Sequence, residues 1–246
     1  MTGNGDFLIV RDNKEARQNR AALVSFTGGT VSRVRPLTWH GPVPVDLESI
    51  AAVPGRPGQF VALSSSGKGM RVVLAGDRVV VLRTFTVPAV QDKDNYEGFA
   101  LTVVKGRTVA VWANRGQDSR PGRLIAAEVD LGRMEFGPIT SATIRAPYPK
   151  KDVRHISDIV VTDSGRVLAS AATDSGDDGP FDSAVYPAAD LSVDNGAVAL
   201  KPVQDNREIA RYPDRKIEAM TCLTPSCDRM LLGTDDENLG GWVRFS

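Results

Sequence analysis

The sequence predicts an all-β protein, a β-propeller of five blades built mostly from four antiparallel strands each. Two observations predict this fold. Short apolar runs bounded by turn residues fill the chain, and one phrase recurs ahead of four of them. The copies of the phrase occupy residues 46–51, 95–100, 155–160 and 216–221. Repeated four-stranded units are typical of propellers, in which the blades pack face to face around an axis.

The 246 residues are interpreted as one domain, residues 1–246, because the composition is even and offers no linker. A hydrophobic content of 41% is sufficient for a core, and the longest apolar runs have the length of strands and are too short to span a bilayer. Thirty basic residues balance thirty acidic ones. This balance argues against nucleic acid or an anionic membrane as a partner.

The predicted strands fall into five groups along the chain. The three central groups contain four strands each, whereas the first and the last contain three. In chain order the strands are expected at residues 7–10, 21–26 and 31–37; 49–53, 60–63, 70–74 and 78–85; 98–104, 108–113, 123–129 and 136–144; 156–162, 166–171, 183–188 and 197–202; and 217–223, 229–233 and 241–245.

The second strand of each group ends in small polar or acidic residues, and counting these endings gives five blades. The phrase recurs in steps of 49, 60 and 61 residues, and the longer steps place extra residues in loops. The first blade is predicted to lack its inner strand, and the last its outer one. Six blades are the main alternative and a two-sheet sandwich a weaker one. We therefore expect either that native residues precede Met1, with a further inner strand after a signal peptide, or that a partner supplies a strand.

The start of each inner strand is expected to lie beside the end of the second strand, so one mouth of the channel gathers oxygen ligands. Crowded carboxylates should take up protons or bind a cation. Calcium suits such hard oxygen donors, whereas two histidines offer no zinc site. The candidate metal ligands are Glu48, Glu97, Glu218, Asp235, Asp236, Asn114 and Asp174. The alternative is that each Glu accepts backbone hydrogen bonds and no ligand is present.

Basic residues accompany the same phrase. They are candidates for binding a phosphate or carboxylate ligand next to a metal ion. The candidate substrate-binding residues are Arg115, Arg154, His155 and Lys216. The alternative is that these charges lie in loops and compensate the carboxylates.

Cys222 and Cys227 flank a predicted hairpin turn in which a disulfide is geometrically feasible, and two free thiols are the alternative. The N-terminal residues 1–6 contain neither the basic nor the apolar part of a signal peptide.

The phrases at residues 46–51 and 95–100, and the closing stretch 232–238, resemble the "esterase-like activity of phytase" group of β-propellers. Glu48, Glu97 and Glu218 occupy the motif positions, followed by Asp235 and Asp236, and Ser157 stands where the motif has Glu. The resemblance implies a propeller, a secreted or periplasmic location and a calcium-assisted hydrolase.

We therefore expect a propeller whose acidic mouth binds calcium and hydrolyses a phosphate or carboxylic ester. The alternative is a non-catalytic propeller that binds a protein or a small anionic ligand over its loop face. The sequence leaves open whether the protein is an enzyme.

Overall fold

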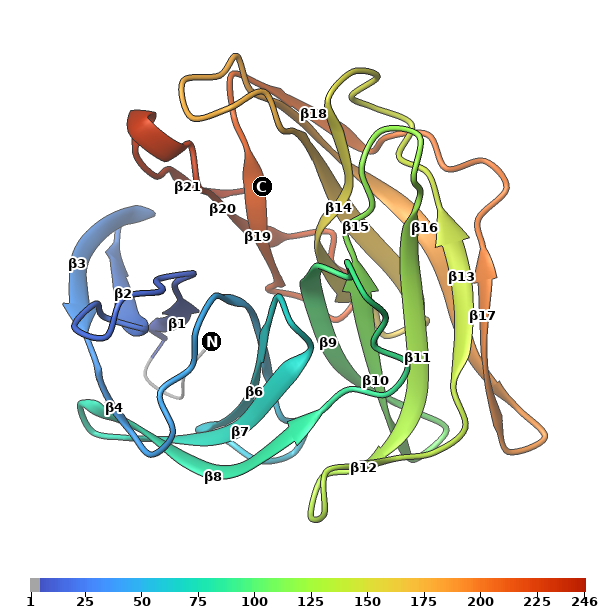
Figure 1. Cartoon of the computed structure of the whole chain (residues 1–246), viewed down its shortest axis with the longest axis horizontal. Helices are drawn as coiled ribbons and strands as arrows, with labels where there is room; N and C mark the ends of the chain where they lie inside the picture. Colours follow the sequence, from blue (N-terminus) through green and yellow to red (C-terminus); the bar gives the residue numbers. More distant parts are fainter. Residues whose placement is uncertain (1–4) are drawn as a thin grey trace.

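The computed structural model describes residues 5–246 and shows the five-bladed β-propeller that the sequence predicts (Figure 1). Five sheets follow one another around an axis, so the first and the last sheet are neighbours. We number them blades I to V in chain order. Most of the N-terminal stretch without signal-peptide features lies outside the described residues. Within residues 5–246, no helix has the length and apolar character needed to cross a membrane.

Blades I and II are formed by the first third of the chain. Blade I has three strands, β1 (Phe7–Val10), β2 (Ala21–Thr27) and β3 (Thr30–Pro36). Blade II has four antiparallel strands, β5 (Leu47–Ala52), β6 (Gln59–Ser64), β7 (Lys68–Ala75) and β8 (Arg78–Thr86), and the short β4 (Thr38–His40) pairs with β8 in parallel.

Blades III to V follow the same order from the axis outward. Blade III comprises β9 (Tyr96–Val104), β10 (Arg107–Asn114), β11 (Gly122–Asp130), β12 (Glu135–Phe136) and β13 (Thr140–Ile144). Blade IV comprises β14 (Val153–Val161), β15 (Arg166–Thr173), β16 (Asp182–Asp194), β17 (Ala197–Pro202) and β18 (Ala210–Pro213). Blade V comprises β19 (Ile217–Cys222), β20 (Met230–Thr234) and β21 (Val243–Phe245), with the 3-10 helix η1 (Glu237–Leu239) before β21.

The strands that the sequence did not predict lie on the outer edges of the blades. One predicted strand over residues 136–144 is divided into β12 and β13, because Pro138 lies between them and has no backbone N–H to donate. β4 and β18 were missed. Both are short, and mostly exposed or half-buried, so they carry little of the apolar signal that marks a strand.

Four buried clusters fill the four interfaces between consecutive blades. Trp112 and Tyr96 lie in the cluster between blades II and III, and Tyr186 lies in the one between III and IV. Leu23 and Phe60 pack between I and II, and further apolar side chains join IV to V. Burying a single large apolar side chain contributes about 1.5–3 kcal/mol, so these interfaces hold the ring together.

Blade V meets blade I differently. Phe245 of β21 packs against Phe26 with ring centroids 4.9 Å apart and against Phe7 at 6.4 Å. Among the described residues no buried cluster like the other four joins these blades. The ring therefore closes through three aromatic side chains.

Candidate functional site

The three glutamates of the recurring phrase each lie at a β-bulge, where one strand has an extra residue. In blade II, Leu47 pairs with Ser64 and Ser49 with Leu63, so Glu48 has no partner. The register shifts in the same way between β9 and β10 around Glu97, and between β19 and β20 around Glu218. A bulge re-aims one side chain locally. The recurring phrase thus presents one carboxyl group from each of three blades at the same mouth of the channel.

Glycine is required after one of these bulges. A Cβ atom on Gly98, the residue after Glu97, would lie 2.9 Å from the Ile159 side chain of blade IV. Blades III and IV therefore approach each other too closely at this point for any other residue.

Blade IV departs from the pattern, as Ser157 in its phrase suggested. Its bulge is wider, because Arg154 pairs with Ala172 and the next pair is Asp158 with Ser170. Arg154 takes the place of a carboxylate at the mouth, and Ser157 is buried. Asp158 points instead to blade V, accepting the N–H of Met220 at 2.6 Å and that of Ile159 at 2.8 Å.

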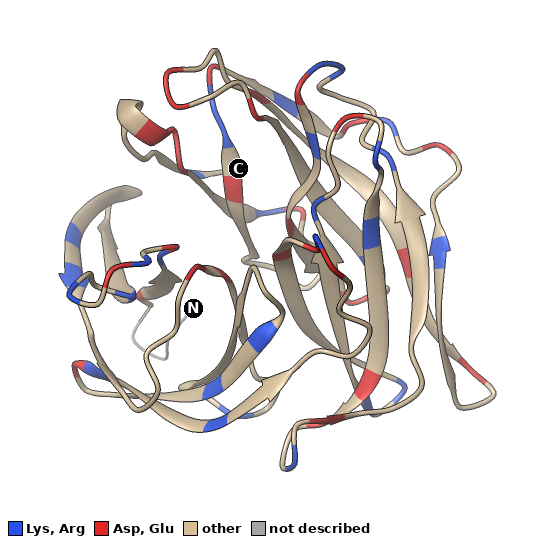
Figure 2. Ribbon diagram, viewed as in Figure 1, with Lys and Arg blue, Asp and Glu red and all other residues tan. Residues whose placement is uncertain are grey.

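The charged groups at the mouth form a continuous chain of ion pairs across blades III, IV and V. The N···O distances along this chain are Arg115 to Glu97 at 3.4 Å, Arg115 to Asp174 at 4.0 Å, Arg154 to Asp174 at 2.6 Å, Arg154 to Glu218 at 3.0 Å, Lys216 to Glu218 at 3.2 Å and Lys216 to Glu237 at 2.5 Å. Figure 2 shows acidic and basic stretches beside one another near the axis. Three predicted metal ligands thus bind three predicted substrate ligands: Glu97, Asp174 and Glu218 pair with Arg115, Arg154 and Lys216.

The carboxyl groups at the mouth hold protons more tightly than usual. Burial raises the pKa of Glu48 to about 10, with the charges of Glu97, Asp46 and Glu218 adding to the effect. Burial likewise raises the pKa of Glu97, against the influence of Arg154 and Arg115. Burial and Glu97 raise the pKa of Glu218 to about 7, although Lys216 lowers it. Crowded carboxyls were expected to take up protons, and near neutral pH Glu48, with a pKa of about 10, carries little negative charge.

Asp174 behaves in the opposite way. Burial favours its neutral form, but the bond to Arg154 outweighs burial and lowers the pKa of Asp174. Three cations of the ion-pair chain face four carboxyl groups. The cations are Arg115, Arg154 and Lys216, and the carboxyl groups are Glu97, Asp174, Glu218 and Glu237. Protonation of Glu218 removes one negative charge from the mouth and so favours an added anion.

Two arginine N–H groups at the mouth lack an acceptor. Among residues 5–246, the Nε atoms of Arg115 and Arg154 are buried and have no hydrogen-bond partner. A buried donor without an acceptor costs about 1–3 kcal/mol, so an anion that reached both guanidinium groups would relieve this cost.

The predicted calcium ligands do not converge as they stand. Asn114 donates to Asp94 and accepts from Gly116, and the buried Asp236 accepts the N–H of Lys216 and contacts Arg215. Asp235 is exposed and accepts the N–H of Glu237. In the described part of the chain no three His, Cys, Asp or Glu side chains form a group that could hold a metal ion. The donor set does not fit calcium in this arrangement, and calcium binding stays a prediction.

His155 is not available to a ligand, contrary to the prediction. The ring is buried; Nδ1 accepts the N–H of Ala146 at 3.2 Å, and Nε2 lies 2.8 Å from the carbonyl oxygen of Asp118, to which it donates in this tautomer. Burial lowers the pKa of His155, which agrees with a neutral ring. The histidine holds two loops of blades III and IV together.

Sequence reasoning missed two members of the site. Glu237 pairs with Lys216, and Gln117 donates to Asp174 at 3.2 Å. Glu237 directly follows the predicted ligands Asp235 and Asp236, so its place in the acidic run was a usable signal. Nothing in the sequence around Gln117 distinguishes it from a loop residue.

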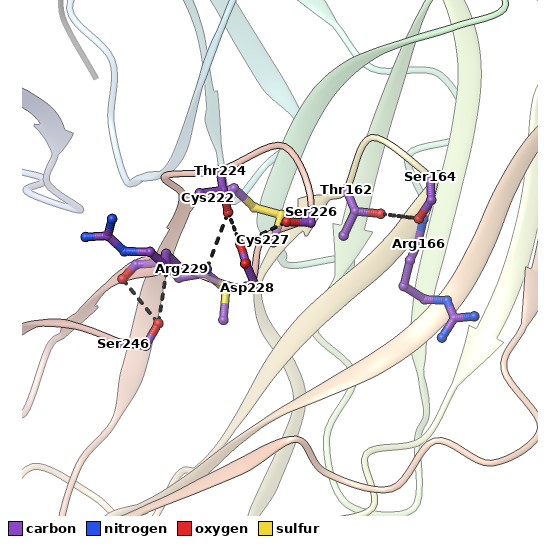
Figure 3. The surroundings of a disulfide bond; sticks show 11 residues. Thr162, Ser164, Arg166, Cys222, Thr224, Ser226, Cys227, Asp228, Arg229 and Ser246 are labelled. Atoms are coloured by element: carbon purple, nitrogen blue, oxygen red, sulfur yellow. Dashed lines mark hydrogen bonds between the residues drawn. A yellow bond between two sulfur atoms is a disulfide. The ribbon is translucent and has the colours of Figure 1, made fainter.

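The disulfide between Cys222 and Cys227 is present, as one of the two sequence interpretations expected. The Cα atoms are 4.7 Å apart, and the bridge closes the turn that follows β19 (Figure 3). Thr224 and Ser226 both donate to Asp228 within this turn. A depression of about 550 Å³ lies beside it, lined by Thr162, Arg166, Ile209, Ser226 and other residues, and includes no member of the ion-pair chain.

Comparison with known proteins gives no family. No family model and no curated protein matches the chain. Solved structures that are similar to the chain include three proteins. A protein of unknown function from Desulfotomaculum acetoxidans is 11% identical with a TM-score of 0.41, and the match covers 92% of this chain and 57% of that protein. A candidate 6-phosphogluconolactonase from Bacteroides uniformis is 15% identical with a TM-score of 0.42, and the match covers 94% of this chain and 68% of that protein. Chaetomium thermophilum Sqt1 is 12% identical with a TM-score of 0.37, and the match covers 80% of this chain and 43% of that protein.

With TM-scores below 0.5, none of these similarities assigns the chain a family or an activity. The chain spans little more than half of the length of the Desulfotomaculum protein. The resemblance to the phytase-like propellers stays a prediction from the sequence.

Proposed function

We propose that the mouth of the channel binds a small anionic ligand, a phosphate or carboxylate compound, through Arg115 and Arg154. The observation that carries this proposal is the pair of buried Nε–H groups without an acceptor. Guanidinium groups bind such anions through paired, charge-assisted hydrogen bonds. Lys216, which is buried beside Glu218, adds positive charge to the same site.

Hydrolysis of an ester is the reaction that this site supports best. A general acid or base works best with a pKa close to the working pH, and the pKa of Glu218 is about 7. Glu218 would take a proton from the attacking water, and the protonated carboxyl group of Glu48 would give one to the departing alkoxide. The arginines would hold the anionic part of the substrate and the charge that develops on the ester.

A panel of phosphate monoesters and carboxylic esters tests the reaction. Hydrolysis by the wild type, and a loss of about 100-fold in kcat for Glu218→Gln, would support it, because general base catalysis typically contributes about 10²–10⁴-fold. Glu135→Gln is the matched control, since Glu135 is exposed on the outer strand β12. A wild type that binds anions and hydrolyses no ester would leave the alternative, a non-catalytic binding propeller.

The location is also part of the proposal. The Cys222–Cys227 disulfide supports an oxidising compartment, such as the periplasm or the exterior of the cell.

A further inference from the structure

Lys216 is a buried cation at the mouth, and one carboxylate separates it from solvent. Its side chain is 3% exposed, and its ammonium group contacts both Glu218 and Glu237. The side chain of Glu237 is 34% exposed, so its carboxylate lies on the solvent side of the ammonium group. An anion from solution can therefore reach Lys216 only by taking the place of Glu237.

Lys216 and Arg154 are neighbours at the mouth. Nη1 of Arg154 lies 3.0 Å from Oε1 of Glu218, and Nζ of Lys216 lies 3.2 Å from the same oxygen atom. The buried Nε of Arg154 also lacks an acceptor. Two cations that share one carboxylate oxygen are spaced for a ligand with two anionic groups on a short chain.

Glu237 lies on a segment that makes few contacts with the rest of the propeller. The segment, residues 237–240, which we call the flap, contains η1, in which no residue is buried. The N–H of Asn238 donates to the carbonyl group of Asp177 at 3.3 Å, and its Nδ2 donates to Asp178 at 3.1 Å. These two bonds join the flap to blade IV. Segments with few buried contacts open locally at low cost.

The flap has a fixed start and a glycine at its end. Asp236, which precedes it, is 1% exposed and accepts the N–H of Lys216 at 2.8 Å, so the chain is held there. Gly240 has a φ of 88° and a ψ of −162°, a conformation that is almost restricted to glycine. Glu237 itself has a φ of 50°, in the left-handed region that is strained for other residues. Such strain is typical of ligand clamps and switches, and movement of the flap would release it.

We propose that Lys216 binds a second anionic group of the ligand, which displaces Glu237 and opens the flap. The inference rests on the proposed anion site of Arg115 and Arg154, and it identifies the ligand as a small compound with two anionic groups, such as a dicarboxylate. One anion replaces another in this exchange, so the buried ammonium group always has a partner. A buried charge without a partner would be costly.

Calorimetry at pH 7 with two matched compounds tests the inference. Glutarate has two carboxylates, and its monoamide, glutaramate, has the same length and one carboxylate. Glutarate should bind at least about tenfold more tightly, the lower end of what a hydrogen bond to a charged group contributes. Lys216→Gln should remove this difference. Equal affinities in the wild type would overturn the second subsite and leave the site of Arg115 and Arg154, whereas no binding of either compound would overturn both.

Two variants that each remove one carboxylate provide a matched pair. Glu237→Gln should tighten glutarate binding several-fold, because no carboxylate then competes for Lys216. Asp177→Asn removes an exposed carboxylate beside the flap and should bind glutarate as the wild type does. Equal effects of the two substitutions would show that only the general charge of the mouth matters and would contradict the competition.

Hydrogen exchange of the wild type measures the flap directly and decides even if Lys216→Gln does not fold. The N–H groups of Asn238, Leu239 and Gly240 donate to carbonyl groups in the closed flap. Saturating glutarate should speed their exchange several-fold, and glutaramate should leave it unchanged. Binding of glutarate with unchanged or slower exchange of these amides would overturn the displacement of Glu237.

Discussion

The backbone N–H of Met220 donates to the carboxyl group of Asp158 across 2.6 Å, which ties blade V to blade IV beside the axis. The other carboxyl oxygen accepts the N–H of Ile159, so both oxygens are used as acceptors. Burial raises the pKa of Asp158 to about 8, although these two bonds lower it.

Asp158→Asn should destabilise the protein by about 1–3 kcal/mol, because the amide turns an N–H donor toward a backbone N–H and leaves one of them unpaired. Urea unfolding at pH 7 measures the change. Asp163→Asn is the control, because Asp163 is exposed, and should change the stability by less than about 0.5 kcal/mol. Equal effects of the two substitutions would contradict this role for Asp158.

The stability of the protein should fall as the pH rises from 6.5 to 8.5. The pKa of Glu48 is raised to about 10 and that of Asp158 to about 8, so the folded state binds more protons in this range than the unfolded chain. Stability falls with pH wherever the folded state binds more protons. The lowered pKa of His155 has the opposite effect, which fades above the ordinary histidine pKa of about 6.5. The lowered pKa of Asp174 places its titration below the range.

Urea unfolding at the two pH values measures the slope. Glu48→Gln should flatten it, with an effect on the order of 1–3 kcal/mol across the range, whereas Glu135→Gln should not. Stability that rises from pH 6.5 to 8.5 would show that these carboxyl groups are ionised in the folded protein.

Loss of the disulfide should lower the free energy of unfolding by about 2 kcal/mol, the value that the chain-entropy model gives for so short a loop. The two cysteines are separated by five positions in the sequence. A reductant should therefore lower the melting temperature of the wild type and leave the Cys222→Ser/Cys227→Ser variant unchanged. Alkylation of both thiols in the protein without reductant would contradict the bridge.

Much of the fold could be predicted because the inner and second strands carry the repeat. Their side chains are buried between blades, so the apolar runs and the phrase had to recur. β4 and β18 lie on outer edges, where packing places few constraints on the sequence, and both were missed.

The site was predictable in part for the same reason. Glu48, Glu97 and Glu218 were found because one bulge repeats. That Arg154 binds Glu218 depends on a contact between blades 64 positions apart in the sequence, and that His155 binds two loops instead depends on one 37 positions apart. No local pattern records such contacts.

Calcium binding is the expectation from the sequence that needs its own experiment. Calcium would have to displace the proton from Glu48, draw Glu97 away from Arg115 and draw Glu218 away from Arg154 and Lys216. With this proton and these ion pairs in place, we expect calorimetric titration of chelator-treated protein to show no saturable calcium binding at pH 7. Saturable binding that Glu97→Gln abolishes would restore the sequence prediction, and Glu135→Gln is the control.

Anion binding at two pH values tests the central claim most directly. Sulfate is a suitable probe, because its charge does not change between pH 6 and 8. Calorimetry should show saturable binding that is several-fold tighter at pH 6, where Glu218, with a pKa of about 7, is largely protonated. Arg115→Gln/Arg154→Gln should abolish it, and Arg133→Gln, whose side chain is 73% exposed, should not. No saturable binding, or binding that survives loss of both arginines, would contradict an anion site at this mouth.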